Sequence, residues 1–240
     1  MKRFFEIDFL RGLAVISMIA YHTLFDLNYF AGYSFPIHSD SLFLFRSFAP
    51  VAFLLIVGLC LSISYSRARS EKGKAGLFKK YLFRGLKTFA LGLAITAITW
   101  LVFPQEFIIF GVLHFIGIAI ILVFPLLGKK RLSLLLGISF ILLGLWLQTF
   151  HVSSHWLLWL GLVPEGFYTF DYFPLLPWLG VVLLGIFFGR ALYPSAERDF
   201  RIPDLSGNRF IAFFSFLGRK SLLIYFLHQP VLVAIILFIA

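Results

Sequence analysis

Three ionisable side chains fall within one apolar segment of this 240-residue chain, RGLAVISMIAYHTLFD. Arg11 and His22 are eleven residues apart, and at about 100° per residue this spacing places them on one helix face, about 16 Å apart in depth. Asp26 follows His22 at the i,i+4 spacing, and a carboxylate beside an imidazole orients the ring for general-base catalysis. Because ionisable groups inside a bilayer are costly and mark sites or pathways, we expect chemistry on this helix.

A structural interpretation of the same residues is also available. Asp8 and Arg11, at i,i+3, can pair and anchor the helix end at the membrane interface. Asp26 can instead neutralise Arg46, which lies in the second apolar segment. For Arg11 both interpretations stay open, whereas for His22 we favour function, because nothing structural requires an imidazole in the middle of the segment.

Two further histidines lie in apolar segments. His114 lies in FGVLHFIGIAIIL, and His228 lies in LLIYFLHQPVLVA, where Pro230 removes a backbone donor and should bend or open the helix. Irregular helices deep in a membrane tend to line cavities. A membrane histidine can equally form a simple hydrogen bond between helices, worth about 0.6 to 2 kcal/mol. Both interpretations stay open for each residue.

The remaining histidines lie in loops. His38 is close to Asp40 in the first loop, while His151 and His155 begin a longer one, where we interpret them as solvated. Neither group has the cysteine or carboxylate spacing of a metal site, so we predict no metal.

The composition is that of an integral membrane protein. Hydrophobic residues make up 60% of the chain and charged residues 13%, with a mean hydropathy of +0.95, which excludes an ordinary soluble domain. The formal charge of +10 comes from short loops between apolar runs, which is a signal of topology and requires no nucleic acid partner. We therefore expect a multi-pass protein of the plasma membrane.

Windows of about 20 residues predict an all-α helix bundle that forms a single domain over residues 1–240. The seven expected transmembrane segments are 7–30, 42–64, 86–103, 108–127, 132–150, 174–192 and 221–240. Alternate loops (31–41, 104–107 and 151–173) contain no Lys or Arg. The positive-inside rule then places the amino terminus in the cytoplasm and the carboxy terminus outside.

Two segments between the predicted spans have a character of their own. Residues 151–173 are too apolar for a free loop and too interrupted by Gly and Pro for a span, so we expect an interfacial or re-entrant segment. Residues 194–218 mix charges with an apolar end, which favours a surface loop followed by a short amphipathic piece.

Several motifs carry a resemblance to known families. The R-x10-H pattern in EIDFLRGLAVISMIAYH resembles the signature of acyltransferase-3 membrane proteins. The D-x-x-R-G stretch from Asp8 to Gly12 is more similar to the catalytic domain of heparan-alpha-glucosaminide N-acetyltransferase and its prokaryotic relatives. Three other motifs share that similarity: FAPVAFLLIVGLCLSISYSR, GVLHFIGIAI and LGRKSLLIYFLHQP.

The resemblance implies an acyltransferase that moves an acyl group, most readily acetyl, from acyl-CoA to a hydroxyl or amine of a carbohydrate or envelope molecule. The implied partners are the lipid bilayer, the acyl-CoA donor, this acceptor and a second copy of the chain. The heparan family usually has Asn where His22 stands and places its essential histidine in the following loop, where this chain has His38. The expected catalytic residues are therefore His22 or His38, with Asp26. The residues assigned to the donor are Arg11, Arg46, His114 and His228.

A proton-coupled transporter is the main alternative, because buried histidines and broken helices also build proton pathways. Inverted repeats would favour it, and the sequence has none. Binding of coenzyme A would separate the two functions, since a simple proton-coupled carrier has no use for it. A retinal protein is excluded, because residues 221–240 contain no lysine.

Overall fold

The computed structural model describes residues 3–37, 39–69, 73–150 and 152–239, and over these residues the regular elements are helices, joined by loops, with no strand. This confirms the predicted all-α class. The α-helices of the described residues are α1 (Phe5–Ala31), α2 (Phe43–Arg69), α3 (Lys74–Val102), α4 (Val112–Leu122), α5 (Lys130–Leu147), α6 (Leu175–Leu192), α7 (Arg209–Arg219) and α8 (Ser221–Ile239). Short 3-10 turns are η1 (Asp40–Leu42), η2 (Phe124–Leu126), η3 (His155–Leu157) and η4 (Pro194–Ala196).

Six helices of the described chain are long and apolar enough to cross a membrane, namely α1, α2, α3, α5, α6 and α8. The expected span at 108–127 differs, because its α-helix, α4, has only eleven residues. That is about 16 Å, against a hydrocarbon core of about 30 Å. Extended backbone at Gly111 begins the helix late, and the 3-10 turn containing Pro125 follows it. The predicted orientation of the two termini stays a prediction.

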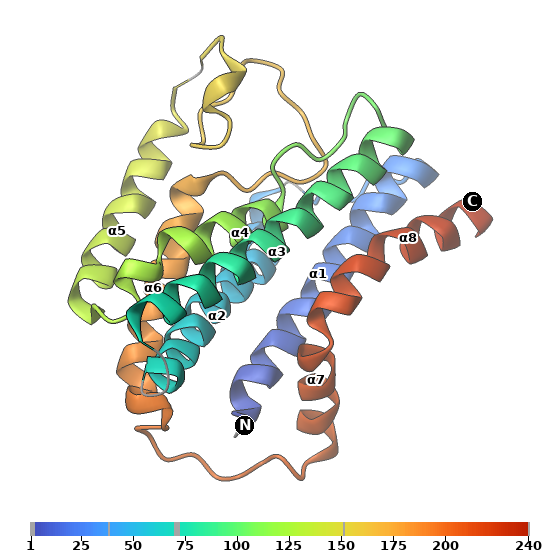
Figure 1. Ribbon diagram of the computed structural model, residues 1–240. Coiled ribbons are helices and arrows are strands. Elements are labelled where there is room, and N and C mark those ends of the chain that lie inside the picture. Colours follow the sequence, from blue (N-terminus) through green and yellow to red (C-terminus); the bar gives the residue numbers. More distant parts are fainter. Residues whose placement is uncertain (1–2, 38, 70–72, 151, 240) are drawn as a thin grey trace. The chain divides into compact units, whose positions relative to one another are not determined.

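Contacts divide the chain into two compact units, Met1–Ile56 with Ile202–Ala240 and Val57–Arg201, and each is described by itself. In the first unit α1 runs alongside α7 and α8 (Figure 1). A Cβ atom on Gly12 would overlap the carbonyl oxygen of Phe214, and one on Gly218 would overlap the carbonyl oxygen of Asp8. Main chain therefore meets main chain between α1 and α7, which only glycine permits at these two positions.

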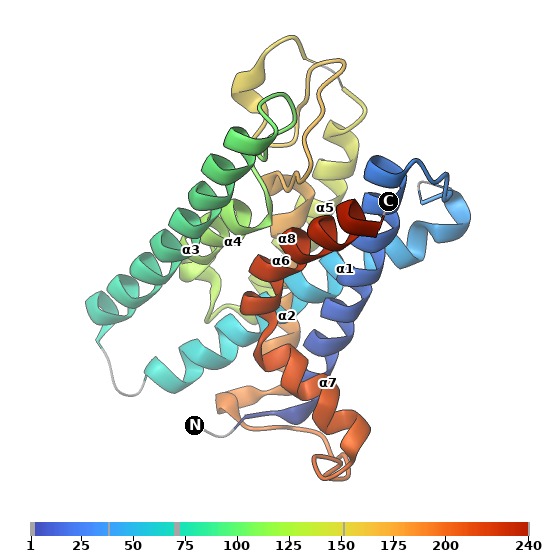
Figure 2. The ribbon, with the colours of Figure 1, turned by 90° about the vertical axis from the view of Figure 1, so that its right-hand side faces the viewer.

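The helix pair α7 and α8 is joined by a single residue. The side chain of Asn208 begins α7, because its Oδ1 accepts hydrogen bonds from the backbone N–H groups of Phe210 (2.9 Å) and Ile211 (3.3 Å). Lys220 alone separates the two helices, and the chain changes direction there (Figure 2). A short helix after a loop agrees with the pattern predicted for 194–218. Of the bend or opening expected at Pro230, the opening is absent, since α8 stays helical through it, and the bend stays a prediction.

The second unit pairs α3 with α4 and α5 with α6 (Figure 1). Glycines again allow the close approach: a Cβ atom on Gly117 would crowd the backbone of Phe89, and one on Gly180 would crowd the carbonyl oxygen of Gly137. Both contacts involve backbone, so neither pair of helices can accommodate a side chain there.

The segment 151–173 is tied to its own unit by hydrogen bonds over its described residues. Thr169 Oγ1 donates to the carbonyl of Phe107 (2.6 Å), and the Tyr172 hydroxyl donates to the carbonyl of Leu158 (2.6 Å). Burial raises the pKa of Tyr172 to about 12, so this hydroxyl keeps its proton at physiological pH. The segment is therefore not a free loop, as expected, and its interfacial or re-entrant placement stays a prediction.

The glycine contact between α1 and α7 gives a direct test. Replacing Gly12 with Ala should destabilise the protein by about 1–3 kcal/mol, because the methyl group must displace the backbone of Phe214. Thermal unfolding of the detergent-purified protein measures the effect as a lower midpoint. Gly207→Ala is the matched control, since a Cβ atom there meets nothing within 4 Å. Equal midpoints for the two variants would contradict the close approach.

Candidate functional site

Four polar side chains meet between α1 and α8 in the first unit. His22 and Asp26 lie one turn apart on α1, and α8 contributes His228 and Gln229. The amide Nε2 of Gln229 lies 3.3 Å from Nδ1 of His22 and 3.4 Å from Oδ1 of Asp26. The ring centroids of His22 and His228 are 5.0 Å apart, with the rings inclined at 61°. We call these four residues the polar cluster.

The sequence spacing suggested a direct contact between the Asp26 carboxylate and the His22 imidazole. In the structure, the amide of Gln229 bonds to both groups instead. Within the described part of the chain, no hydrogen bond joins Asp26 to His22, and no ion pair joins Asp26 to Arg46. Arg46 instead lies over the ring of Phe43, 5.2 Å from its centroid. The sequence did contain a signal for Gln229, because an amide in an otherwise apolar span needs a hydrogen-bond partner.

The polar cluster is incompletely satisfied and partly buried, since Asp26 and His228 are buried and His22 and Gln229 are partly exposed. Asp26 is 1% exposed and His228 is 8% exposed. Three buried atoms have no hydrogen-bond partner among the described residues: Asp26 Oδ2, Gln229 Oε1 and His228 Nε2. An unsatisfied buried polar atom costs about 1–3 kcal/mol and calls for an explanation in a functional or missing partner.

The hydrogen-bond partners define where the protons lie in the polar cluster. His228 Nδ1 is 2.7 Å from the carbonyl oxygen of Tyr225. A carbonyl only accepts, so Nδ1 carries the proton and Nε2 of the neutral ring is an acceptor. At His22 the order is reversed: the amide NH₂ of Gln229 only donates, so Nδ1 accepts and Nε2 carries the proton. The carboxylate of Asp26 fixes the amide in this orientation.

All three unsatisfied atoms are therefore hydrogen-bond acceptors, and the nearby His22 presents a donor. Such a set can take a proton from a bound hydroxyl or amine and can stabilise negative charge that develops on a neighbouring oxygen. O–H or N–H groups are the kind of partner that can satisfy these atoms.

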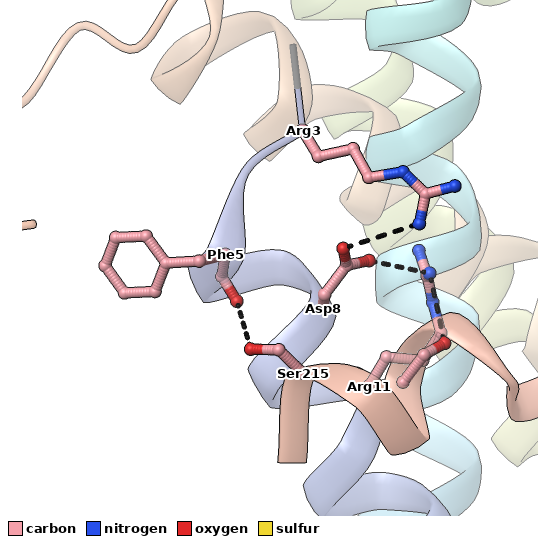
Figure 3. Close-up of polar contacts among 6 residues, drawn as sticks. Arg3, Phe5, Asp8, Arg11 and Ser215 are labelled. Carbon is pink, nitrogen blue, oxygen red and sulfur yellow. Dashed lines mark hydrogen bonds and ion pairs between the residues drawn. The ribbon is translucent and has the colours of Figure 1, made fainter. Parts of the chain in front are cut away.

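Arg11 lies in the second turn of α1, next to α7 (Figure 3). Its Nη1 atom donates to Asp8 Oδ1 (3.2 Å), as expected from the i,i+3 spacing, and to the carbonyl oxygen of Gly218 (3.4 Å). Arg3 approaches the other carboxylate oxygen of Asp8 at 4.0 Å. The Gly218 carbonyl is in the last turn of α7, where partial negative charge favours a cation. Arg11 thereby joins α1 to the segment that leads directly into α8.

His114 belongs to the second unit, where both of its ring nitrogens are engaged. Nδ1 accepts from the backbone N–H of Gly111 (3.3 Å), and Nε2 lies 3.2 Å from Thr96 Oγ1. The Thr96 hydroxyl donates to the carbonyl of Ile108 (2.6 Å), so it accepts from His114 Nε2–H. These bonds account for an imidazole that is 2% exposed. Its assignment to the donor stays a prediction.

The loop histidines and a metal site were also considered from the sequence. His38 lies outside the described residues. His155 is exposed on η3, in agreement with a solvated loop residue. Over the described ranges, no group of three or more His, Cys, Asp or Glu side chains is arranged to hold a metal ion.

Comparison with family models identifies the family of the chain. A family model with the description "Heparan-alpha-glucosaminide N-acetyltransferase, catalytic" matches residues 3–230. The match spans both units and contains all four residues of the polar cluster. It confirms the resemblance seen in the motifs. No curated protein and no solved structure matches the chain significantly.

The contacts of Arg11 predict a stability effect. Arg11→Met should lower the stability by about 1.5–3 kcal/mol, because it removes charged hydrogen bonds from Asp8, which is 7% exposed, and from Gly218. Thermal unfolding in detergent measures the loss. Arg209→Met, at an exposed position of α7, serves as the control and should leave the midpoint nearly unchanged. An unaltered midpoint for Arg11→Met would rule out the structural role.

The hydroxyl of Thr96 gives a second prediction. Thr96→Val keeps the shape of the side chain but leaves the Ile108 carbonyl and His114 Nε2–H without their partner, at a cost of about 1–3 kcal/mol. Thr88→Val is the matched control, because its hydroxyl bonds to the Arg84 carbonyl one turn earlier in the same helix. The difference between the two unfolding midpoints is the measurement, and no difference would refute the bond to His114.

Proposed function

The chain belongs to the heparan-alpha-glucosaminide N-acetyltransferase catalytic family, and from this premise we propose that it transfers an acetyl group from acetyl-CoA to a hydroxyl or amine of a carbohydrate or envelope molecule. The family and the six apolar helices make it a multi-pass membrane acetyltransferase. The donor, the acceptor class, the role of the histidines and a location in the plasma membrane are the proposed parts.

The observation that carries the proposal is the set of three buried acceptors without partners in the polar cluster. A hydroxyl or amine nucleophile supplies the O–H or N–H bonds that Asp26, Gln229 and His228 lack. Unsatisfied polar atoms destabilise the packing of two apolar helices. A role in binding the acceptor explains why they are present.

Acetyl transfer also matches the chemistry of the cluster. The nucleophile must lose a proton as it attacks the thioester carbonyl, and a membrane-embedded histidine is a suitable base near neutral pH. The acetyl group passes to the acceptor directly or through an acyl-histidine, and coenzyme A leaves as the thiol.

Two guanidinium groups can contribute to binding of the donor. Arg11 and Arg46 are basic residues within spanning helices, and guanidinium groups bind phosphates through paired hydrogen bonds. We assign these two arginines to the coenzyme on the resemblance. The Arg11→Met variant separates the two roles, since a donor contact raises the KM for acetyl-CoA and a structural contact lowers only the unfolding midpoint.

A transfer assay on membranes tests the function. Membrane vesicles from producing cells contain the natural envelope acceptors, and they are supplied with acetyl-CoA labelled in its acetyl group. We expect label in an envelope fraction together with an equal amount of released coenzyme thiol. His22→Ala and His228→Ala should each reduce transfer by at least about 100-fold. His155→Ala, at an exposed loop position, is the control and should match the wild type.

Two results would contradict this function. Vesicles that incorporate no more label than vesicles lacking the protein would show that it is no acetyltransferase. Proton uptake that depends on His22 and His228, with no binding of coenzyme A to the purified protein, would identify the transporter that buried ionisable groups also suit.

A further inference from the structure

We infer that His228, which the resemblance assigns to binding the acyl donor, is instead the general base of the proposed acetyl transfer. His22, one of the two bases expected from sequence, is instead the hydrogen-bond donor to the thioester carbonyl. The inference rests on the proposed function, and it follows from which nitrogen of each ring is already occupied.

His228 has the arrangement of a base. Its Nδ1–H donates to the Tyr225 carbonyl at 2.7 Å, which holds the ring in place and keeps the proton on that nitrogen. Its Nε2 lone pair is buried and has no partner in the described chain. A histidine base in a hydrolytic triad is oriented in the same way, by an acceptor on one nitrogen that leaves the other free to take a proton.

His22 has the opposite arrangement. The Gln229 amide donates to Nδ1, so the neutral ring carries its proton on Nε2. To act as a base at Nε2, His22 would need its proton on Nδ1, where it would face the amide N–H donor. Its Nε2–H is instead suited to a developing oxyanion. The rings of His22 and His228 are 5.0 Å apart, close enough for both to act on one reacting group.

Asp26 and Gln229 position His22 without touching the substrate carbonyl. The Asp26 carboxylate accepts one amide hydrogen of Gln229, which leaves the other hydrogen directed at His22 Nδ1. Asp26 therefore acts on His22 through Gln229, and its orienting role needs no direct contact with the ring.

With these roles, every bond and proton of the acetyl transfer is accounted for. The acceptor hydroxyl or amine attacks the thioester carbon while its proton moves to His228 Nε2, and the carbonyl oxygen becomes an oxyanion that accepts a hydrogen bond from His22 Nε2–H. When the tetrahedral intermediate collapses, the carbon–sulfur bond breaks and the thiolate takes the proton from His228. The products are the acetylated acceptor and coenzyme A thiol, and both histidines regain their starting protonation.

Asparagine substitutions distinguish a donor from a base. Asparagine keeps an N–H donor but has no basic lone pair, so His22→Asn should recover most of the kcat that His22→Ala loses, a loss of about 10²–10³-fold. His228→Asn should recover nothing relative to His228→Ala, with both reduced about 10²–10⁴-fold. The vesicle assay measures all four variants, with His155→Asn as the exposed control.

Proton positions are measured independently of activity. Nitrogen NMR of the full chain, labelled at histidine and held in lipid nanodiscs, should show His22 protonated at Nε2 and His228 protonated at Nδ1. Gln229→Leu should release His22 into a mixture of tautomers and leave His228 unchanged. Gln148→Leu, at the exposed end of α5, should alter neither ring.

Two outcomes would overturn the inference: a wild-type His22 protonated at Nδ1, and an active His228→Asn variant. If His38→Asn is inactive while His228→Asn is active, the base is His38. A wild-type protein without transfer activity would instead overturn the proposed function and the assigned roles together. The wild-type assay therefore separates failure of the function from failure of the base assignment alone.

Discussion

The amide of Gln229, shared between His22 and Asp26, is the interaction on which the rest of the candidate site depends. One NH₂ group satisfies an imidazole nitrogen and a carboxylate oxygen from the same face of α1. In apolar surroundings an unpaired polar group is costly, so these bonds resist any rotation or slide of α8 along α1. The same two bonds decide which His22 nitrogen carries the proton. The same bonds thus set both the position of α8 along α1 and the proton position on His22.

The position of α8 also depends on what precedes it. Gly12 and Gly218 let α1 and α7 approach until their backbones touch, and Arg11 bonds across that contact to the Gly218 carbonyl. Because only Lys220 intervenes before α8, this contact sets where α8 begins. Arg11, one half of the sequence signature, thus has a structural function in supporting the histidines of the polar cluster.

Hydropathy and spacing predicted the all-α membrane class, six of the spanning helices, the shared helix of His22 and Asp26 and the Asp8–Arg11 pair. They did not predict the shortness of α4, because a hydropathy window does not register extended backbone at Gly111 or the turn at Pro125. They missed Gln229, because its amide is uncharged and does not stand out as an ionisable side chain does in an apolar segment. The expected Asp26–Arg46 pair was wrong, because partners between helices follow from packing that no local spacing encodes.

The contact of main chain with main chain between α1 and α7 has an evolutionary consequence. Where two side chains meet, one can shrink as the other grows, so a lineage can exchange them in successive steps. Gly12 and Gly218 face carbonyl oxygens that every residue type carries, so no compensating substitution exists for them. We therefore expect these two positions to stay glycine during sequence divergence. The exposed rings of Phe210 and Phe213 on α7 can be exchanged for other side chains.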